Sequence, residues 1–191
     1  MTEQEQPKIR YTIADLERIA ALPENLNKQF ELLDGKLYEI MPEITLYAFI
    51  IKRFQRFIDE FVKEYLLGYV FSDRCSYAFA DDQVLVPDCS FVSKNKGIQP
   101  PFPDKFPFAP DLAIEVVSPS NRSRELMNKI QNYLKYSTRL VWVVYLDDQV
   151  IEGYRTAAEG FNVRTFNIHA SLDGEDVLPG FKLEVWLVFP V

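Results

Sequence analysis

Histidine and cysteine are scarce in this sequence of 191 residues, which has one His and two Cys. The single histidine, His169, excludes histidine-rich metal sites, and any Ser-His-Asp triad would have to use it. Because His169 falls in a late strand-like stretch far from the motifs described below, we expect no catalytic role for it. Cys75 and Cys89 lie 14 positions apart without a CxxC pairing, which predicts two buried free thiols.

Positive charge is also in short supply. The chain has 21 Lys and Arg against 28 Asp and Glu, so its formal net charge is 21 − 28 = −7. Proteins that hold nucleic acid mainly through charge usually have a clear positive excess. The composition therefore excludes a strongly basic nucleic-acid-binding protein.

Long apolar runs are missing as well. The first ten residues are polar and charged, unlike a signal peptide, and no stretch approaches the ~20 apolar residues of a membrane span. We therefore expect a cytoplasmic protein that does not interact with a membrane. What the sequence does have is 48% hydrophobic and 14% aromatic residues, enough for a packed core. Since it shows no repeat or long linker, we expect a single domain over residues 1–191.

The spacing of apolar residues predicts three helices. Thr12 and Asp15 have the spacing of a capping box, which begins a short helix that ends at Ile19 or Ala20. Apolar residues then recur every three or four positions in two longer segments. Gly68 is expected to end the first of these. The two longer helices are expected at about 44–67 and 122–136.

Strand signals fill most of the remaining sequence. Asp34-Gly35 separates the strand-like runs 30–33 and 36–40, which predicts a β-hairpin. The continuous apolar run 140–146 indicates a central strand that is covered on both faces. The proline-rich segment 99–104 should form a surface loop. Further strands are expected near 69–80, 84–92, 111–117, 149–155, 161–168 and 182–189. This order predicts an α/β or α+β fold, with a mixed β-sheet flanked by helices and an N-terminal helix and hairpin.

Glu115 is the residue that points most directly to chemistry. A carboxylate within an apolar strand is unfavourable unless it is paired or binds a metal. Asp88 lies in a similar setting on an earlier strand, and if the two strands are neighbours the side chains could converge within about 5 Å. Asp111 is the competing partner, but four strand residues place it roughly 13 Å from Glu115, too far to share a cation. We therefore expect Asp88 to be the partner, and Asp111 to be a strand-entry residue.

Two carboxylates and a nearby backbone carbonyl form an oxygen-rich site that suits Mg²⁺ or Mn²⁺. A lysine beside such a site could position an attacking water and offset charge on a phosphate. Lys129 is a candidate because it shares a helix face with Glu125 and Tyr133, each four residues away. Other interpretations stay open. Glu115 could form a buried ion pair with Lys129 without a metal, Lys129 could pair with Glu125 in solvent, and Tyr133 could simply belong to the core.

These residues belong to a pattern that extends over almost the whole chain. In its order and spacing, the pattern resembles a large bacterial family of restriction-endonuclease-like proteins of unknown function within the PD-(D/E)xK nuclease superfamily. No single motif identifies this family, but the motifs in this order and spacing do. The motifs are FELLDG at 30–35, PD at 87–88, EVVSPS at 115–120, Lys129, Tyr133, VWVV at 141–144 and LDGEDVLPGF at 172–181.

The resemblance implies a restriction-endonuclease-like core with Asp88 and Glu115 as metal ligands and the Val116 carbonyl as a third. The lysine of the superfamily usually stands two residues after the acid, where this chain has Val117, and in this family its role corresponds to Lys129. Glu31 matches an acidic position of the family near the site, although a structural role for it is also open.

The chain departs from the family in two places. Residues 137–139 are Ser-Thr-Arg where the family often has Gly-Val, and residues 45–47 are Thr-Leu-Tyr where it often has a histidine. Neither change removes an expected metal ligand. The turn Ser118–Ser120 could donate hydrogen bonds to a phosphate, but we expect it to cap the following helix.

The leading hypothesis is a Mg²⁺- or Mn²⁺-dependent endonuclease that hydrolyses phosphodiester bonds in DNA, with a homodimer as one way to cut both strands. The alternatives are a catalytically inactive module of the same fold that serves binding or assembly, and an enzyme that acts on small phosphoesters. Residues 120–139 carry 5 − 1 = +4, which leaves −7 − 4 = −11 for the rest of the chain. This distribution predicts weak, salt-sensitive binding of DNA near that segment.

Overall fold

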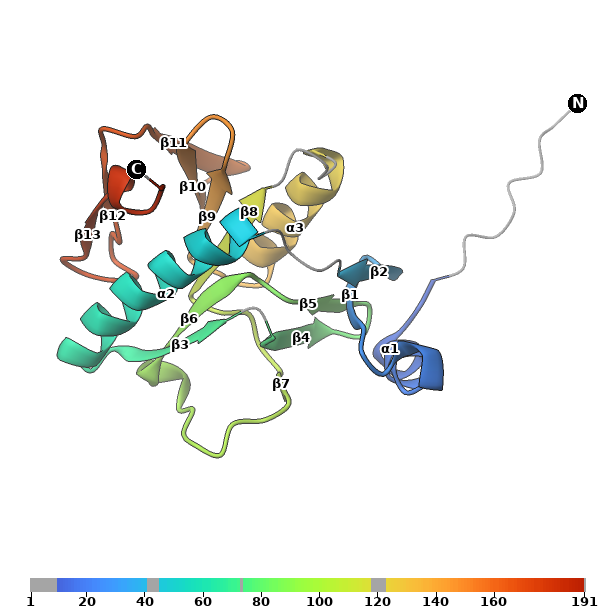
Figure 1. The fold of residues 1–191 in the computed structure, drawn as a ribbon. Helices are drawn as coiled ribbons and strands as arrows, with labels where there is room; N and C mark the ends of the chain where they lie inside the picture. Colours follow the sequence, from blue (N-terminus) through green and yellow to red (C-terminus); the bar gives the residue numbers. More distant parts are fainter. Residues whose placement is uncertain (1–9, 41–44, 73, 118–122, 191) are drawn as a thin grey trace, which may run out of the picture.

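The computed structural model of the protein describes residues 10–40, 45–72, 74–117 and 123–190. Within these ranges no helix is long and apolar enough to cross a membrane. The described chain forms three α-helices and thirteen strands, which are arranged in three sheets (Figure 1). The helices are α1 (Ile13–Ala20), α2 (Thr45–Glu64) and α3 (Ser123–Lys135), and short 3-10 turns cover Pro23–Asn25, Lys94–Lys96 and Val185–Leu187.

The largest sheet has six strands in the order β11-β10-β9-β8-β6-β3. Only the pair β8/β9 is parallel, and the other neighbours are antiparallel, so the sheet is mixed as predicted. The apolar strand β9 lies in its interior and is buried on both faces, again as predicted. The strands are β3 (Gly68–Ser72), β6 (Cys89–Ser93), β8 (Leu112–Val117), β9 (Leu140–Tyr145), β10 (Val150–Thr156) and β11 (Phe161–Phe166).

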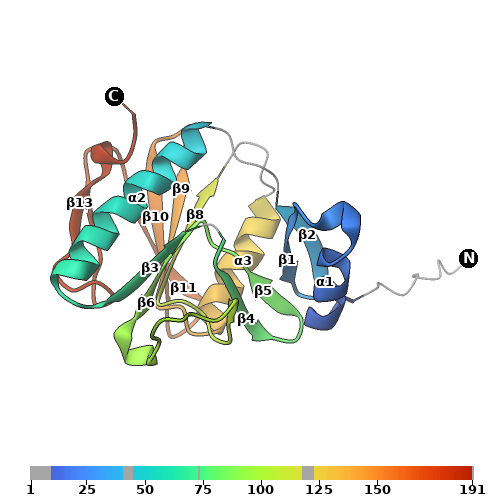
Figure 2. The same ribbon diagram turned by 60° about the horizontal axis from the view of Figure 1, so that its bottom comes forward.

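Helices α2 and α3 cover opposite faces of this sheet (Figure 2). On one face, Phe54 of α2 packs with Trp142 of β9 at a ring distance of 6.1 Å. On the other face, Ile130 and Tyr133 of α3 pack in a second core with Val143. Successive residues of a strand point to opposite faces, so the side chain of each residue on β8 faces one helix or the other.

A second sheet lies beside α3 and has the order β2-β1-β5-β4-β7. Its first two strands form the predicted hairpin, with Asp34 and Gly35 at φ values of 52° and 71° in the turn. Strands β12 (Ser171–Asp173) and β13 (Lys182–Glu184) form a separate hairpin. The strands of the second sheet are β1 (Gln29–Leu33), β2 (Lys36–Ile40), β4 (Ser76–Ala80), β5 (Gln83–Leu85) and β7 (Lys105–Phe106).

The helix boundaries are close to those predicted, with one error. The capping box of α1 is present, because the Thr12 hydroxyl accepts the Asp15 N–H and the Asp15 carboxylate accepts the Thr12 N–H. Gly68 does not end α2. The helix ends at Glu64, and it is Leu66 that adopts the left-handed conformation, with φ of 52°. Gly68 begins β3, where a Cβ atom would lie only 2.1 Å from the Val92 carbonyl oxygen.

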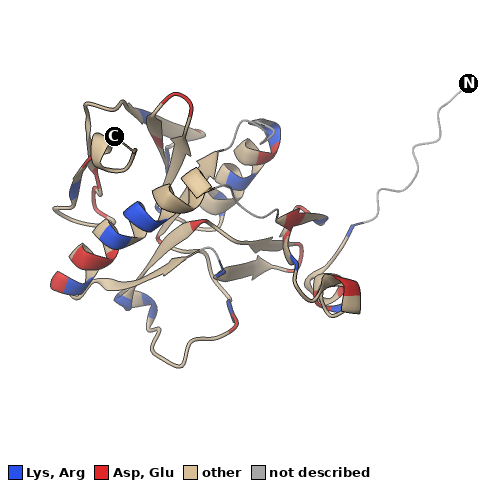
Figure 3. Cartoon of the chain, in the orientation of Figure 1, with Lys and Arg blue, Asp and Glu red and all other residues tan. Residues whose placement is uncertain are grey.

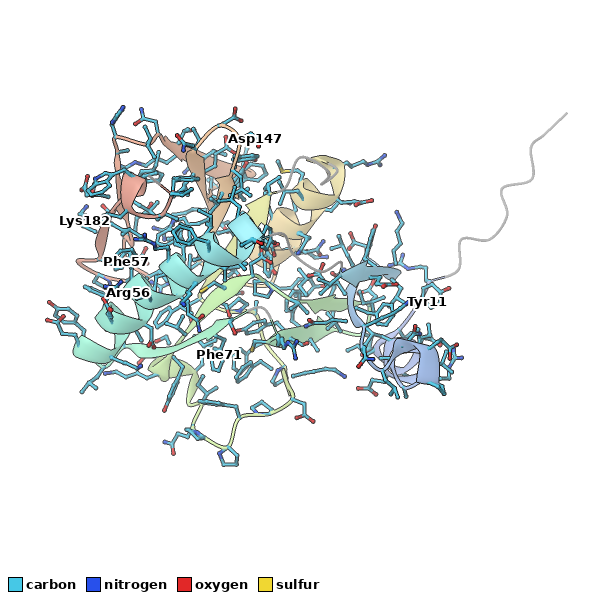
Figure 4. All side chains as sticks on the ribbon, in the orientation of Figure 1. Tyr11, Arg56, Phe57, Phe71, Asp147 and Lys182 are labelled. Atoms are coloured by element: carbon cyan, nitrogen blue, oxygen red, sulfur yellow. The ribbon has the colours of Figure 1, made fainter. Side chains whose placement is uncertain are left out.

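Several predicted strands are interrupted. The stretch 69–80 divides into β3 and β4, and 84–92 divides into β5 and β6 because the chain leaves one sheet for the other at Pro87. The stretch 182–189 is only partly a strand, since β13 gives way to a 3-10 turn. Strands β7 and β12 were not predicted. The segment 99–104 is a loop as expected. Its Phe102 packs edge-on against Phe71 of β3, which is labelled in Figure 4, with 5.1 Å between the ring centroids.

Candidate functional site

Glu115 lies in the middle of the mixed sheet and points toward α3. The neighbouring residues Ile114 and Val116 belong to the core beneath α2, whereas Ala113 belongs to the core beneath α3. Because side chains alternate along a strand, Glu115 shares the α3 face with Ala113. Only 6% of Glu115 is exposed, so its carboxylate depends on protein partners.

Asp88 is the first of these neighbours. It lies in the bend directly before β6 and not within a strand as predicted, but the pairing of Cys89 with Ile114 brings it beside Glu115. Its N–H donates to the Ile114 carbonyl at 3.0 Å, and its carboxylate accepts the Val116 N–H at 2.6 Å. The N–H and C=O of one strand residue point to the same side, so the Val116 carbonyl lies along the same edge as Asp88.

Helix α3 provides two hydrogen-bond donors to the Glu115 carboxylate. The Lys129 ammonium donates to Oε2 of Glu115 at 2.8 Å, and the Tyr133 hydroxyl donates to Oε1 at 2.8 Å. Residues four apart on a helix lie on one face, which explains why one helix reaches both oxygens of the same carboxylate. The alternative interpretation, in which Lys129 pairs with Glu125 in solvent, is therefore wrong. The Lys129 side chain is only 16% exposed and pairs with Glu115.

Glu31 brings the second sheet to the site. Its Oε1 lies 2.9 Å from the Lys129 Nζ and accepts the Val86 N–H at 2.8 Å. The ammonium therefore bridges two carboxylates that come from β1 and β8. Glu31 also holds the backbone where the chain crosses from one sheet to the other, so it combines a charge at the site with a structural hydrogen bond.

Counted over the described residues that form this cluster, the charges do not balance. When ionised, Glu31, Asp88 and Glu115 contribute three negative charges against the one positive charge of Lys129, 1 − 3 = −2. Burial raises the pKa of Glu115 to about 8, opposed by Lys129 and reinforced by the other two carboxylates. For Lys129, burial alone would lower the pKa, but the carboxylates of Glu115 and Glu31 raise it above its ordinary value. Burial and the charge of Glu115 raise the pKa of the Tyr133 hydroxyl.

The oxygen atoms of this cluster suit a hard divalent cation. Within the described ranges no group of three or more His, Cys, Asp or Glu side chains is placed to hold a metal. A site here would therefore use Asp88, Glu115 and the Val116 carbonyl, with water completing the shell, as Mg²⁺ commonly allows. The bound oxygens of Glu115 do not prevent this, because each carboxylate oxygen has two lone-pair positions.

The other candidate residues lie elsewhere. Asp111 precedes β8, where it accepts the Ser93 N–H at 2.8 Å, so it is the strand-entry residue that was expected. His169 is exposed in the turn after β11. Cys75 and Cys89 are free thiols, the first half-buried and the second buried. The turn Ser118–Ser120 lies outside the described residues.

Sequence reasoning missed two polar contributions of α3. Tyr133 was expected in the core, and it is fully buried, but the hydrogen bond from its hydroxyl to Glu115 was not foreseen. Its spacing from Lys129 was the available signal. Asn132 is also buried, and its amide donates to the Asn128 carbonyl at 2.9 Å and approaches Asp34 at 3.4 Å. No sequence pattern indicated this contact.

Basic and acidic positions are interspersed along the ribbon of the described residues (Figure 3). Many basic side chains are held in ion pairs, for example Arg56 with Glu60 at 2.9 Å and Lys63 with Asp59 at 2.6 Å. Of the basic residues expected to attract phosphate, Lys129 is committed to the buried site.

Known proteins resemble this chain in sequence and fold. A family model described as "Uma2: Putative restriction endonuclease" matches residues 14–186. Among solved structures, the crystal structure of a putative nuclease belonging to DUF820 from Anabaena variabilis is similar, with 21% sequence identity, a TM-score of 0.80 and coverage of 93% of this chain and 97% of that chain. None of the curated proteins matches the chain. The predicted nuclease-like fold is thus confirmed.

Proposed function

Because the chain belongs to the Uma2 family, described as putative restriction endonucleases, we propose that it is a metal-dependent endonuclease that hydrolyses phosphodiester bonds in DNA. The observation that carries this proposal is the buried surplus of carboxylates around Glu115. Among the described residues, Glu31 and Glu115 share the Lys129 ammonium and Asp88 lies beside Glu115, in a site with little exposure to water. Such a surplus is unfavourable for the fold alone, and a divalent cation would compensate it.

In this proposal Asp88, Glu115 and the Val116 carbonyl hold Mg²⁺ or Mn²⁺ in an arrangement of the PD-(D/E)xK type. The cation would supply activation of water and stabilisation of the charge that develops at phosphorus. The protein fixes the ligands beforehand. The Val116 N–H orients Asp88, and Lys129 and Tyr133 orient Glu115.

Lys129 has a second anchor that keeps it at the site. A cation on Glu115 would weaken the attraction between that carboxylate and the ammonium, but Glu31, 2.9 Å from Nζ, would retain it. Lys129 would then be able to orient the attacking water and offset charge on the scissile phosphate. Glu31 therefore acts in catalysis by holding Lys129.

DNA is the substrate that we propose, and we expect it to bind weakly. The acidic composition and the many ion-paired basic side chains leave few cations for phosphate contacts. Because the contacts that remain are electrostatic, added salt should weaken this binding further. We further propose that residues 1–191 act as one cytoplasmic domain, since the family match extends over 14–186, and that two copies pair when both strands are cut.

Plasmid nicking with Mg²⁺ or Mn²⁺ tests the proposal. We expect wild-type protein to nick plasmid only with a divalent cation, and Asp88→Asn and Glu115→Gln to reduce nicking to background. Asp111→Asn is the matched control, because Asp111 is also a buried aspartate that follows a proline and accepts a backbone N–H. Equal cleavage by wild type and both site variants would identify a contaminating nuclease and reject the proposal.

The ion pair between Lys129 and Glu115 favours a second candidate, an inactive module of the same fold used for binding or assembly. In that case the ammonium is the permanent counter-ion of the site. Calorimetric titration with Mn²⁺ distinguishes the two. Binding that Asp88→Asn abolishes supports the endonuclease, and no binding supports the module. Cleavage of small phosphoesters but not of plasmid would indicate a different substrate.

A further inference from the structure

Among the described residues, Glu115 has hydrogen bonds from the charged Lys129 and from the uncharged Tyr133 hydroxyl. The Tyr133 ring is fully buried in the core beneath α3, and its hydroxyl donates to Oε1 of Glu115 at 2.8 Å. A buried hydroxyl without a partner destabilises a protein, but a core position could be filled by phenylalanine without introducing a hydroxyl at all. The presence of the hydroxyl therefore needs an explanation from the site.

Lys129 and Tyr133 differ in how firmly they hold the same carboxylate. The ammonium of Lys129 is at the end of a flexible side chain and has a second acceptor in Glu31. The Tyr133 ring has few rotatable bonds and is fixed by packing with Ile130 and Val143. A cation on Glu115 would leave Lys129 its second acceptor in Glu31, whereas the packed Tyr133 ring would keep its hydroxyl at Glu115.

We propose that Tyr133 is a positioning residue that fixes the Glu115 carboxylate for metal binding. This inference rests on the proposed function of the same site. By holding Oε1, the hydroxyl prevents rotation of the carboxylate when Lys129 moves away from Oε2. Glu115 is then already oriented when the cation arrives, so the free energy of metal binding includes no cost for ordering this carboxylate. Partners that orient a metal ligand typically change metal affinity by about 10–100-fold.

The test is Tyr133→Phe, which removes one oxygen atom and keeps the ring. We expect calorimetry without DNA to show about 10–100-fold weaker binding of Mn²⁺. In nicking assays, the Mn²⁺ concentration for half-maximal rate should rise by the same factor, while the rate at saturating Mn²⁺ stays within a few-fold of wild type. A residue that only stabilises the fold would not separate these two quantities.

Tyr154→Phe is the matched control. Tyr154 is buried in the same core, and its hydroxyl donates to the Glu152 carboxylate at 2.6 Å, so the substitution also removes one hydrogen bond from a tyrosine to a carboxylate. Its Mn²⁺ affinity should equal that of wild type. If Tyr133→Phe binds Mn²⁺ as tightly as Tyr154→Phe does, the positioning role is rejected while the proposed function stands. If wild-type protein binds no Mn²⁺, both proposals fail.

A spectroscopic measurement covers the case in which Tyr133→Phe does not fold. With 3-fluorotyrosine placed at position 133 alone, Mg²⁺ should shift the fluorine resonance with the midpoint of metal binding. The same label at position 154 should show no shift. An unchanged resonance at position 133 while Mg²⁺ binds would also reject the positioning role.

Discussion

Two clusters of ion pairs in this protein have opposite surroundings. The buried cluster joins Lys129 to Glu31 and Glu115. The other cluster lies near the surface, where Arg155 pairs with Glu175 and, at 2.6 Å, with Asp176. This second cluster also includes Arg139, which pairs with Asp176, so that two guanidinium groups face two carboxylates. Nearby, Lys182, labelled in Figure 4, pairs with Asp173 at 2.5 Å.

The surface cluster is partly solvated, and its two positive charges equal its two negative charges. Partial burial alone would raise the pKa of Asp176, but hydrogen bonds from Arg139 and Arg155 keep it below its ordinary value. In the buried cluster, burial raises the pKa of Glu115, and the Lys129 ammonium opposes this only in part. The two pKa shifts have opposite directions because hydrogen bonds from two guanidinium groups outweigh partial burial at Asp176, whereas full burial outweighs the Lys129 ammonium at Glu115.

The largest effect should come from Lys129→Met. The substitution leaves the buried acids Glu31 and Glu115 without the Lys129 ammonium. At pH 8.5 each of them must then either stay charged or take up a proton, and removing one partner of a buried ion pair costs about 3–5 kcal/mol of unfolding free energy. Urea unfolding without divalent metal measures this. Lys135→Met on the same helix is the control, because Lys135 is exposed, and it should change stability by less than about 0.5 kcal/mol. Similar losses in both variants would contradict the contrast between the clusters.

The next effect is a dependence of stability on pH. The folded protein holds the Glu115 proton up to a pKa of about 8, whereas the ordinary value is 4.5, so folding takes up a proton between these values. The stability that this proton provides is complete below pH 4.5 and is lost as the pH rises toward 8. The titration of Glu115 should change the free energy of unfolding by at most about 1.4 kcal/mol per pH unit.

Urea midpoints between pH 5 and about pH 8, in EDTA, check this slope. Glu115→Gln should remove it, because the amide does not titrate. Glu159→Gln changes an exposed acid in the turn between β10 and β11 and should leave the slope as in wild type. A stability of wild type that rises over this pH range would contradict the raised pKa of Glu115.

The smallest effect should come from the surface cluster. Arg155→Met should lower stability by about 1 kcal/mol or less, because partly solvated ion pairs contribute little. Much of that difference should disappear between about 0.1 M and 1 M NaCl, since the Debye length falls from roughly 10 Å to 3 Å. Urea unfolding at both salt concentrations measures it. A loss that exceeds the one in Lys129→Met would reverse the comparison.

The elements that follow from local rules were predictable from sequence. The Thr12 capping box, the Asp34-Gly35 hairpin and the buried strand 140–146 depend on neighbouring residues alone, and all are present. The errors arise where tertiary contacts decide. The predicted strand 84–92 is interrupted near Pro87 because the chain passes there from the second sheet to the six-stranded sheet. Strand β7 is defined only by the pairing of Lys105 and Phe106 with β4.

The site follows the same division. The apolar neighbours of Glu115 predicted a buried carboxylate, and the pattern of acids predicted that Asp88 would lie beside it. The sequence could not show that Lys129 would pair with two buried acids and not with Glu125 on its own helix, because this pairing depends on where β1 packs. For the same reason the hydrogen bond from Tyr133 was not predicted, although its place in the core was.

The attachment of Glu31 to Lys129 also has a consequence for biosynthesis. Glu31 comes from the first hairpin, in the second sheet, and Lys129 comes from α3, which packs against the six-stranded sheet. Contacts between segments so distant in sequence form late in folding. While the chain emerges from the ribosome, Glu31 is therefore present long before its cation partner. The cluster is complete only after α3 has been synthesised and docked, so a truncated chain that ends before α3 would have the acids without the Lys129 ammonium.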